Sequence, residues 1–166
     1  MGWPKSSSGP SPAPTSVERQ ELFCVQIALG VHKKSILPIS VGANVYAQRT
    51  AHSEPGTIAP RDCDGKMIVA LFAQRSPGTP RATGDDSAVA RLRWFERSLD
   101  RLGSLMAASG AEAVAMPFNI GCGLAGGAWP AYRKRLDDFA SRYAVSVRLY
   151  DLDGVSAASL GSNRES

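Results

Sequence analysis

The feature that most constrains the fold is an alternation of short apolar runs with helical patterns in the second half of the chain. Lys66–Ala73 (KMIVALFA) is a continuous apolar run, typical of a strand that is buried on both faces of a parallel sheet. Further strands are predicted at Ala113–Phe118 (AVAMPF) and Val145–Leu149 (VSVRL), and a helical pattern separates each pair. This order predicts an α/β fold with parallel strands and helices on the faces of the sheet.

The first helical pattern follows a turn-rich segment, Ser76–Asp85, and both Asp85 and Asp86 are good N-caps. Apolar residues then recur at intervals of three and four, as in an amphipathic helix: Val89, Leu92, Phe95, Leu99, Leu102 and Met106. Charged residues are expected on its other faces: Arg91, Arg93, Glu96, Arg97, Asp100 and Arg101. Gly110 closes this helix, and a second is predicted from about Pro130 to about Tyr143.

The two ends of the chain have compositions that disfavour folding. Residues 1–16 are rich in Ser, Pro and Gly, and residues 156–166 are small and polar, so we predict two disordered tails around one domain of residues 17–155. Within the first half of that domain, strands are predicted at Glu21–Ile27 and Ser35–Ser40, and Pro38 places the second of these near a sheet edge.

Composition and charge limit the classes of function. The cysteines, Cys24, Cys63 and Cys122, are odd in number and widely spaced, so they predict neither a disulfide framework nor a metal site. No apolar run is long enough for a membrane helix, and we expect an intracellular monomer without a cofactor. The net charge of +4 is modest and its basic residues are scattered, so nucleic acid is not the expected partner, although an anionic small ligand is compatible.

A glycine-rich loop carries the chemistry that can be inferred from the residues. Gly121, Gly123, Gly126 and Gly127 crowd seven residues (GCGLAGG) between a predicted strand and a predicted helix, where ligands bind in open α/β sheets. Without Cβ atoms, backbone N–H groups can approach an anion closely, and the following helix adds the positive end of its dipole. The loop therefore predicts a phosphate site.

Two other interpretations of this loop stay open. A glycine cluster can merely let a helix pack tightly against a sheet. Alternatively, Gly121, Gly123 and Gly126 match the G-x-G-x-x-G pattern of dinucleotide-binding loops, with Asp151 or Asp153 as the acid that would follow. That pattern normally opens a large doubly wound domain, whereas here one predicted strand remains.

The segment AMPFNIGCGLAGGAWP, at Ala115–Pro130, resembles the second ligand loop of macro domains, which bind ADP-ribose. The segments IVALFAQRSPGTP (Ile68–Pro80) and RLRWFERSLDRL (Arg91–Leu102) are similar in order and spacing to macro proteins of the ADP-ribosyl-hydrolase type. The resemblance implies a three-layer α/β/α sandwich with a mixed, mostly parallel sheet. It also implies that the partner is ADP-ribose or an ADP-ribosylated protein, and that Ile120–Gly127 wraps the diphosphate and the distal ribose.

The resemblance is weaker in the first half of the chain, where VGANVYAQ (Val41–Gln48) is only faintly similar to the first ligand loop of the family.

Tyr150 follows the last predicted strand, at the place where macro domains hold adenine, and its ring is suited to stacking. The alternative is that Tyr150 is an aromatic residue that caps the core. The ligand-binding residues that the resemblance implies are Gly42, Ala43, Asn44, Gln74, Phe118, Asn119, Ile120, Gly121, Cys122, Gly123, Leu124, Ala125, Gly126, Gly127, Tyr150 and Leu152.

The sequence lacks the catalytic side chains that hydrolases of this family commonly use, so rapid hydrolysis is not predicted. Some related hydrolases have a lysine after the strand that resembles Ile68–Ala73 and an aspartate after G-C-G-L, whereas this chain has Gln74 and Ala125. Neither side chain can act as a nucleophile or a general acid or base. We therefore expect binding, with at most weak hydrolysis of mono-ADP-ribose linkages or of ADP-ribose 1''-phosphate. The alternative is a structural or interaction module with a degenerate pocket.

Overall fold

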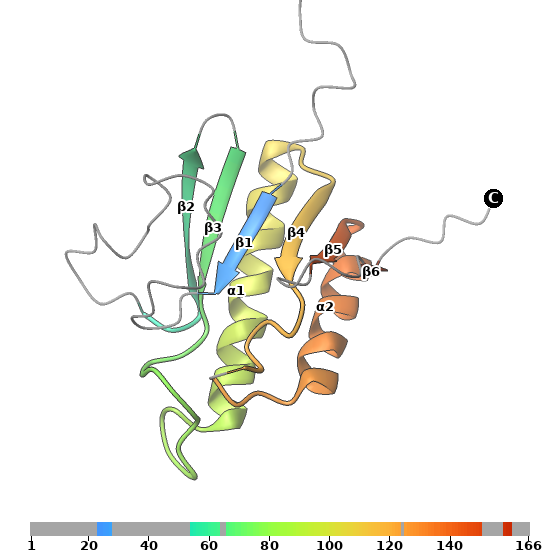
Figure 1. The fold of residues 1–166 in the computed structure, drawn as a ribbon. Coiled ribbons are helices and arrows are strands. Elements are labelled where there is room, and N and C mark those ends of the chain that lie inside the picture. The colour runs from blue at the N-terminus through green and yellow to red at the C-terminus, as the bar shows by residue number, and fades with distance from the viewer. Residues whose placement is uncertain (1–22, 28–53, 64–65, 124, 151–157, 161–166) are drawn as a thin grey trace, which may run out of the picture.

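The computed structural model describes residues 23–27, 54–63, 66–123, 125–150 and 158–160 (Figure 1). In chain order its elements are β1 (Phe23–Ile27), β2 (Thr57–Cys63), β3 (Lys66–Phe72), α1 (Ala88–Ser109), β4 (Ala113–Pro117), α2 (Trp129–Tyr143), β5 (Ser146–Tyr150) and β6 (Ala158–Leu160). These strands form one sheet in the order β2-β3-β1-β4-β5-β6. The predicted α/β class is confirmed for the described residues.

The four central strands of the sheet are parallel. β1 lies between β3 and β4, with Cys24 opposite both Ile68 and Ala115, and β4 continues to β5. The α1 helix connects β3 to β4, and α2 connects β4 to β5. The predicted strands at Glu21–Ile27, Lys66–Ala73, Ala113–Phe118 and Val145–Leu149 are confirmed within one or two residues at each described end. The prediction at Ser35–Ser40 lies outside the described residues.

Both outer strands are antiparallel, and neither was predicted. β2 pairs with β3 over its whole length, although Pro60 lies inside it. Proline cannot donate to a ladder, but on an outer strand its nitrogen can face away from the neighbour. β6 pairs with β5 through Ala158–Leu160, so strand structure occurs within residues 156–166, where a tail was expected.

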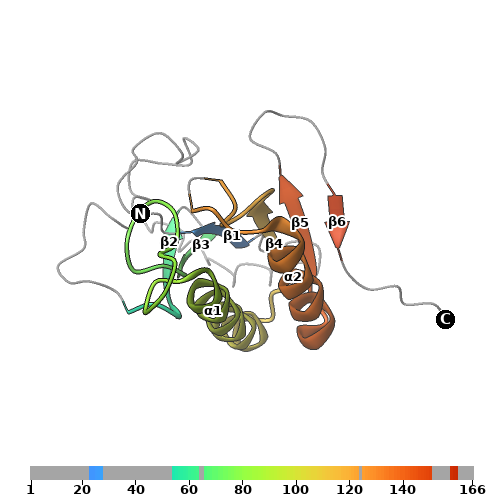
Figure 2. The ribbon, with the colours of Figure 1, turned by 90° about the horizontal axis from the view of Figure 1, so that it is seen from below.

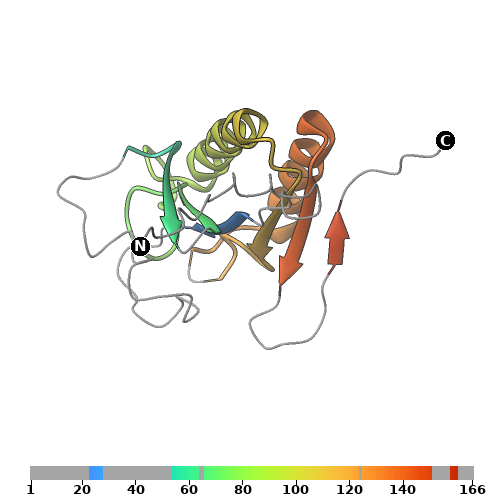
Figure 3. The ribbon, with the colours of Figure 1, turned by 90° about the horizontal axis from the view of Figure 1, so that it is seen from above.

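Both helices cover the same face of the sheet, as Figures 2 and 3 show from opposite sides. The side chains between the layers alternate along each strand, as expected for one face of a pleated sheet. They come from β3, β4 and β5: Val69, Leu71, Val114, Met116, Val147 and Leu149. The helices contribute Phe95, Leu99, Leu102, Met106, Leu136 and Phe139. This continuous apolar layer fixes both helices relative to the strand ends.

The opposite face of the sheet is also buried at β3 and in part of β4, whereas at β5 it carries the exposed side chains of Arg148 and Tyr150. Ala70 and Phe72 of β3 are 1% and 4% exposed and form a second, smaller apolar cluster with Ala59 of β2. On β4, Ala115 is buried as well. A strand that is buried on both faces is the environment predicted from the continuous apolar run in β3.

The start of α1 differs from the sequence prediction. Its N-cap is Ser87, whose hydroxyl accepts the amide of Ala90 at 3.3 Å. Asp86, which was expected to cap, instead turns its carboxylate toward Arg91. Val89, expected on the apolar face, is 62% exposed. The C-terminus follows the prediction, because Gly110 takes the left-handed conformation that commonly ends helices.

Candidate phosphate-binding loop

The sheet brings the predicted site residues of the second half to one edge. Because β1, β3, β4 and β5 are parallel, their carboxyl ends share that edge, and the segments that follow β3 and β4 meet there (Figure 1). Gln74 follows β3, the glycine loop follows β4, and Tyr150 ends β5. This is the position at which open α/β sheets bind their ligands.

The backbone of the glycine loop uses left-handed conformations at three points. Asn119, Gly121 and Gly126 have φ of 56°, 77° and 66°. Asparagine tolerates this region better than most residues, and glycine adopts it without a steric cost. Gly123 is not in this region, so the conformational reason for glycine holds at Gly121 and Gly126 but not at Gly123.

Close packing explains three of the four glycines. A Cβ on Gly121 would lie 2.5 Å from the ring of Tyr132, and one on Gly127 would lie 2.5 Å from the carbonyl oxygen of Gly121. A Cβ on Gly126 would lie 2.9 Å from Pro80. A Cβ on Gly123 would meet no described residue within 4 Å, so packing among the described residues does not require glycine there.

Some amides of the loop are used internally and others are not. Cys122, Gly126 and Gly127 donate to carbonyl oxygens within the loop at 2.9, 2.9 and 3.1 Å. The amides of Gly121 and Gly123 make no hydrogen bond to any residue that the structure describes. Three internal bonds therefore hold the loop in shape, and they leave the amides of Gly121 and Gly123 unused among the described residues.

The helix that follows the loop also has an open N-terminus. The N-cap of α2 is Ala128, which has no side chain to bond the first amides, and Pro130 lies in the first turn. No acidic residue occupies that turn. Since the dipole of a helix favours negative charge at this end, an anion beside the loop would be stabilised.

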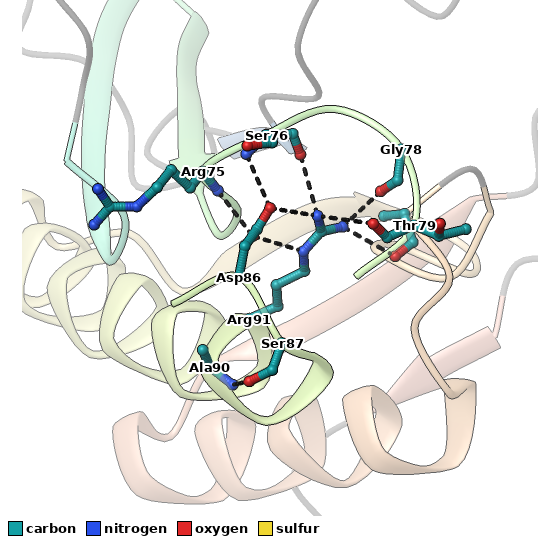
Figure 4. Close-up of polar contacts among 9 residues, drawn as sticks. Arg75, Ser76, Gly78, Thr79, Asp86, Ser87, Ala90 and Arg91 are labelled. Carbon is teal, nitrogen blue, oxygen red and sulfur yellow. Dashed lines mark hydrogen bonds and ion pairs between the residues drawn. The ribbon is translucent and has the colours of Figure 1, made fainter. Parts of the chain in front are cut away.

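One buried side chain connects the two loops at this edge. Arg91 of α1 is 2% exposed, and its Nε and Nη2 donate to the two carboxylate oxygens of Asp86 at 2.8 and 2.7 Å (Figure 4). Its Nη1 donates to the carbonyl oxygens of Gly78 at 2.6 Å and Ala125 at 3.2 Å. Arg91 thus ties the segment after β3 to the glycine loop.

Asp86 fixes the other side of this cluster. Its carboxylate accepts the amides of Arg75 and Ser76, each at 3.2 Å. Burial acts to raise the pKa of Asp86, but the hydrogen bonds from Arg91, Arg75 and Ser76 and the charge of Arg91 outweigh it, so the pKa lies below its ordinary value of 3.8. The carboxylate is therefore ionised at neutral pH and serves as a structural anion.

Aromatic side chains lie at the ends of β4 and β5. Phe118 and Tyr150 are 40% and 42% exposed, and the amide of Phe118 donates to the carbonyl oxygen of Tyr150 at 2.7 Å. Phe118 also packs edge-on against Trp129, with ring centroids 5.0 Å apart. Partly exposed aromatic side chains therefore flank the glycine loop at these two strand ends.

The loop itself offers no evident catalytic group. Burial raises the pKa of the Cys122 thiol to about 11, so it stays protonated at neutral pH and is a poor nucleophile. Burial likewise raises the pKa of Tyr132 to about 12. Ala125 is buried and contributes only its backbone. Gln74 is half-buried, and its Nε2 has no hydrogen-bond partner among the described residues.

The predicted residues therefore fall into two groups. The structure brings one group to the carboxyl edge: Gln74, Phe118, Asn119, Ile120, Gly121, Cys122, Gly123, Ala125, Gly126, Gly127 and Tyr150. Within it, Ile120 and Ala125 turn their side chains into the core and can offer only backbone groups. Another group lies outside the described residues: Gly42, Ala43, Asn44, Leu124 and Leu152, as do Asp151 and Asp153. Arg91 and Asp86 were not predicted as residues of the site.

A signal for Arg91 was present in the sequence. It lies four residues before Phe95 and eleven before Leu102, so it shares the buried stripe of α1 rather than a charged face. Asp86, five residues earlier, is an acid within reach of it. A basic residue on an apolar stripe with an acid near the helix start predicts a buried ion pair.

No protein-family model matches this chain, and a search of curated proteins found no significant relative. No group of three or more potential metal ligands is found in the described parts of the chain. No helix among those parts has both the length and the apolar character to cross a membrane.

Proposed function

We propose that this protein binds ADP-ribose, free or attached to a protein, with its diphosphate on the glycine loop. The observation that carries the proposal concerns the backbone amides of Gly121 and Gly123. Their amides make no hydrogen bond to described residues, at the carboxyl edge of a parallel sheet, beside an uncapped helix N-terminus. Backbone amides and a helix dipole are the groups that bind phosphate without needing a basic side chain.

Two aromatic side chains next to the loop support the proposal that the ligand contains adenosine. Phe118 and Tyr150 present partly exposed rings on adjacent strand ends, next to the loop. We place adenine against Tyr150 and a ribose near Phe118, which flanks the start of the loop. The resemblance of Ala115–Pro130 to the second ligand loop of macro domains supports the same assignment.

The proposal includes a three-layer α/β/α sandwich. Its support is the burial of Ala70, Phe72 and Ala115 on the face of the sheet opposite α1 and α2. Apolar side chains on that face need a covering layer of their own, and a second layer of helices would supply it.

Turnover is expected to be absent or weak. The partly buried thiol of Cys122 stays protonated, and Gln74 and Ala125 hold positions at which the hydrolases that this sequence resembles have a lysine and an aspartate. The site is therefore proposed to recognise ADP-ribose rather than to cleave its linkages rapidly.

Calorimetric titration of the whole chain with ADP-ribose tests the proposal. Adenosine and inorganic pyrophosphate, titrated separately, each represent half of the ligand, and the proposal expects both to bind more weakly than ADP-ribose. Folded protein that releases no heat with ADP-ribose at high micromolar concentration would contradict it.

A structural or interaction module is the second candidate function. The observation that favours it is the use of three loop amides, those of Cys122, Gly126 and Gly127, in bonds that shape the loop itself. Thermal unfolding with and without ADP-ribose separates the candidates, because a ligand of the folded state raises the midpoint of unfolding.

NADH serves as the comparison ligand in the same experiment. A larger rise in the midpoint with NADH than with ADP-ribose would indicate a site for another dinucleotide.

A further inference from the structure

Three arginines form a ridge on the solvent face of α1. Arg93, Arg97 and Arg101 are all exposed and lie four residues apart. Residues at this spacing lie on one face of a helix, with a rise of about 6 Å from each to the next. We call these three residues the arginine ridge.

The acidic residues of α1 do not neutralise the ridge. Glu96 and Asp100 turn toward α2, where they pair with Arg135 at 3.4 Å and Arg142 at 2.6 Å. The ion pairs among described residues include no member of the ridge. The positive charge of the ridge is therefore uncompensated within the described part of the molecule.

The exposed basic residues of α2 differ in this respect. Arg133 pairs with Asp137 at 3.4 Å, and Lys134 pairs with Asp138 at 2.9 Å, each one helical turn away. The solvent face of α2 is thus close to neutral, whereas that of α1 is not. Composition alone could not reveal this separation.

An arginine lies over an aromatic ring beside the ridge. The guanidinium carbon of exposed Arg75 lies 6.0 Å from the centre of the Trp94 ring. Trp94 is half-buried and precedes Arg97 by three residues, a spacing at which side chains of a helix are neighbours. Arginine forks match phosphate oxygens in pairs, and planar rings or guanidinium groups beside them can stack on bases.

We infer that this surface of α1, the ridge together with Arg75 and Trp94, binds the phosphate backbone of a nucleic acid. Evenly spaced, uncompensated arginines in a straight row suit a regular chain of phosphates, and the Arg75–Trp94 pair suits a flanking base better than an acidic peptide. The net charge of +4 and a sequence pI near 9.2 act in the same direction. The basic residues that look scattered along the sequence are gathered by the helix. This inference does not depend on the ligand of the glycine loop.

Fluorescence anisotropy with labelled oligo-dT and with a random-sequence DNA duplex tests it, over a salt series from about 50 to about 200 mM. The ridge variant is Arg93→Gln, Arg97→Gln, Arg101→Gln. The matched control, Arg133→Gln, Lys134→Gln, Arg142→Gln, removes the same three charges from α2. A further variant with lysine at the three ridge positions preserves charge and checks the fold.

The inference expects the whole chain to bind at least one of the two DNA probes. The ridge variant should bind at least about tenfold more weakly, and its log–log salt slope should be about 2 units shallower. The α2 control should stay within about threefold of the unmodified chain, and the lysine variant should recover most of the affinity. The inference is overturned if neither DNA probe binds, or if polyglutamate binds as well as DNA. It is also overturned if both glutamine variants lose affinity equally, or if the lysine variant binds no better than the ridge variant.

Discussion

Arg91 and Asp86 form a two-point ion pair, with oxygen to nitrogen distances of 2.8 and 2.7 Å, between the two loops that flank the proposed ligand site. Both side chains are almost fully buried. The remaining donors of Arg91 reach carbonyl oxygens of both loops, including that of Ala125 in the glycine loop. The shape of the proposed phosphate site therefore depends on an ion pair whose side chains lie outside the glycine loop.

Replacing Arg91 with methionine should destabilise the protein strongly. The change leaves the Asp86 carboxylate buried without its partner, which costs about 3–5 kcal/mol of unfolding free energy. Urea unfolding followed by circular dichroism measures this. Arg133→Met is the control, because Arg133 forms an exposed pair, and should cost about 1 kcal/mol or less. A loss at Arg91 no larger than at Arg133 would show that the buried pair contributes little.

Stability should fall in acid because of Asp86. Its pKa is lower in the folded protein than the ordinary value of 3.8, so the folded state binds the proton less tightly than the unfolded chain. The contribution of Asp86 is complete above that value and is lost as the pH falls through the lower, folded pKa. Urea unfolding at a series of pH values, compared with Asp86→Asn, measures it. An equally steep acid decline in the variant would assign the effect to other carboxyl groups.

The glycines of the loop should separate into structural and functional positions. Gly121→Ala forces an alanine into φ of 77° and against Tyr132, so it should lower the unfolding free energy by more than about 1 kcal/mol. Gly123→Ala meets no described residue and lies outside the left-handed region, so it should change the unfolding free energy by less than about 0.5 kcal/mol. Thermal and urea unfolding of the two variants test this. Equal losses would mean that the loop geometry described above is wrong.

The thiol of Cys122 should be slow to react. With a pKa of about 11 it is almost entirely protonated at pH 8, and the thiolate is the reactive form. Iodoacetamide labelling, followed by mass spectrometry of the peptide that contains Cys122, should show slower modification than in the urea-unfolded chain. Faster labelling in the folded protein would indicate an activated thiol and would reopen the question of catalysis.

Much of the fold was predictable because its signals are local. The apolar run of β3, the period of α1 and the glycine at its end each follow from a few neighbouring residues. β2 was missed because Pro60 argues against a strand, and only the position of the strand at the outside of the described sheet accommodates it. β6 was missed because its three residues gain their order from pairing with β5.

The candidate site was predictable in part for the same reason. The glycine loop is contiguous in sequence, so its position after a strand could be inferred, and the structure places it at the expected edge. The packing requirement for glycine depends on contacts with Tyr132 of α2 and Pro80 of the segment after β3. Neither residue is part of the glycine loop. The role of Arg91 depends on carbonyl oxygens of two loops, and no local pattern specifies those contacts.

The central claim is that an anion of ADP-ribose occupies the open space beside Gly123. Calorimetric titration of Gly123→Val with ADP-ribose tests it most directly, because a Cβ at this position meets no described residue within 4 Å. Ala107→Val, exposed near the far end of α1, is the matched control. The account predicts that the unmodified chain and Ala107→Val bind alike and that Gly123→Val, still folded, loses about tenfold or more, at least about 1.4 kcal/mol. Undiminished affinity in folded Gly123→Val would contradict it.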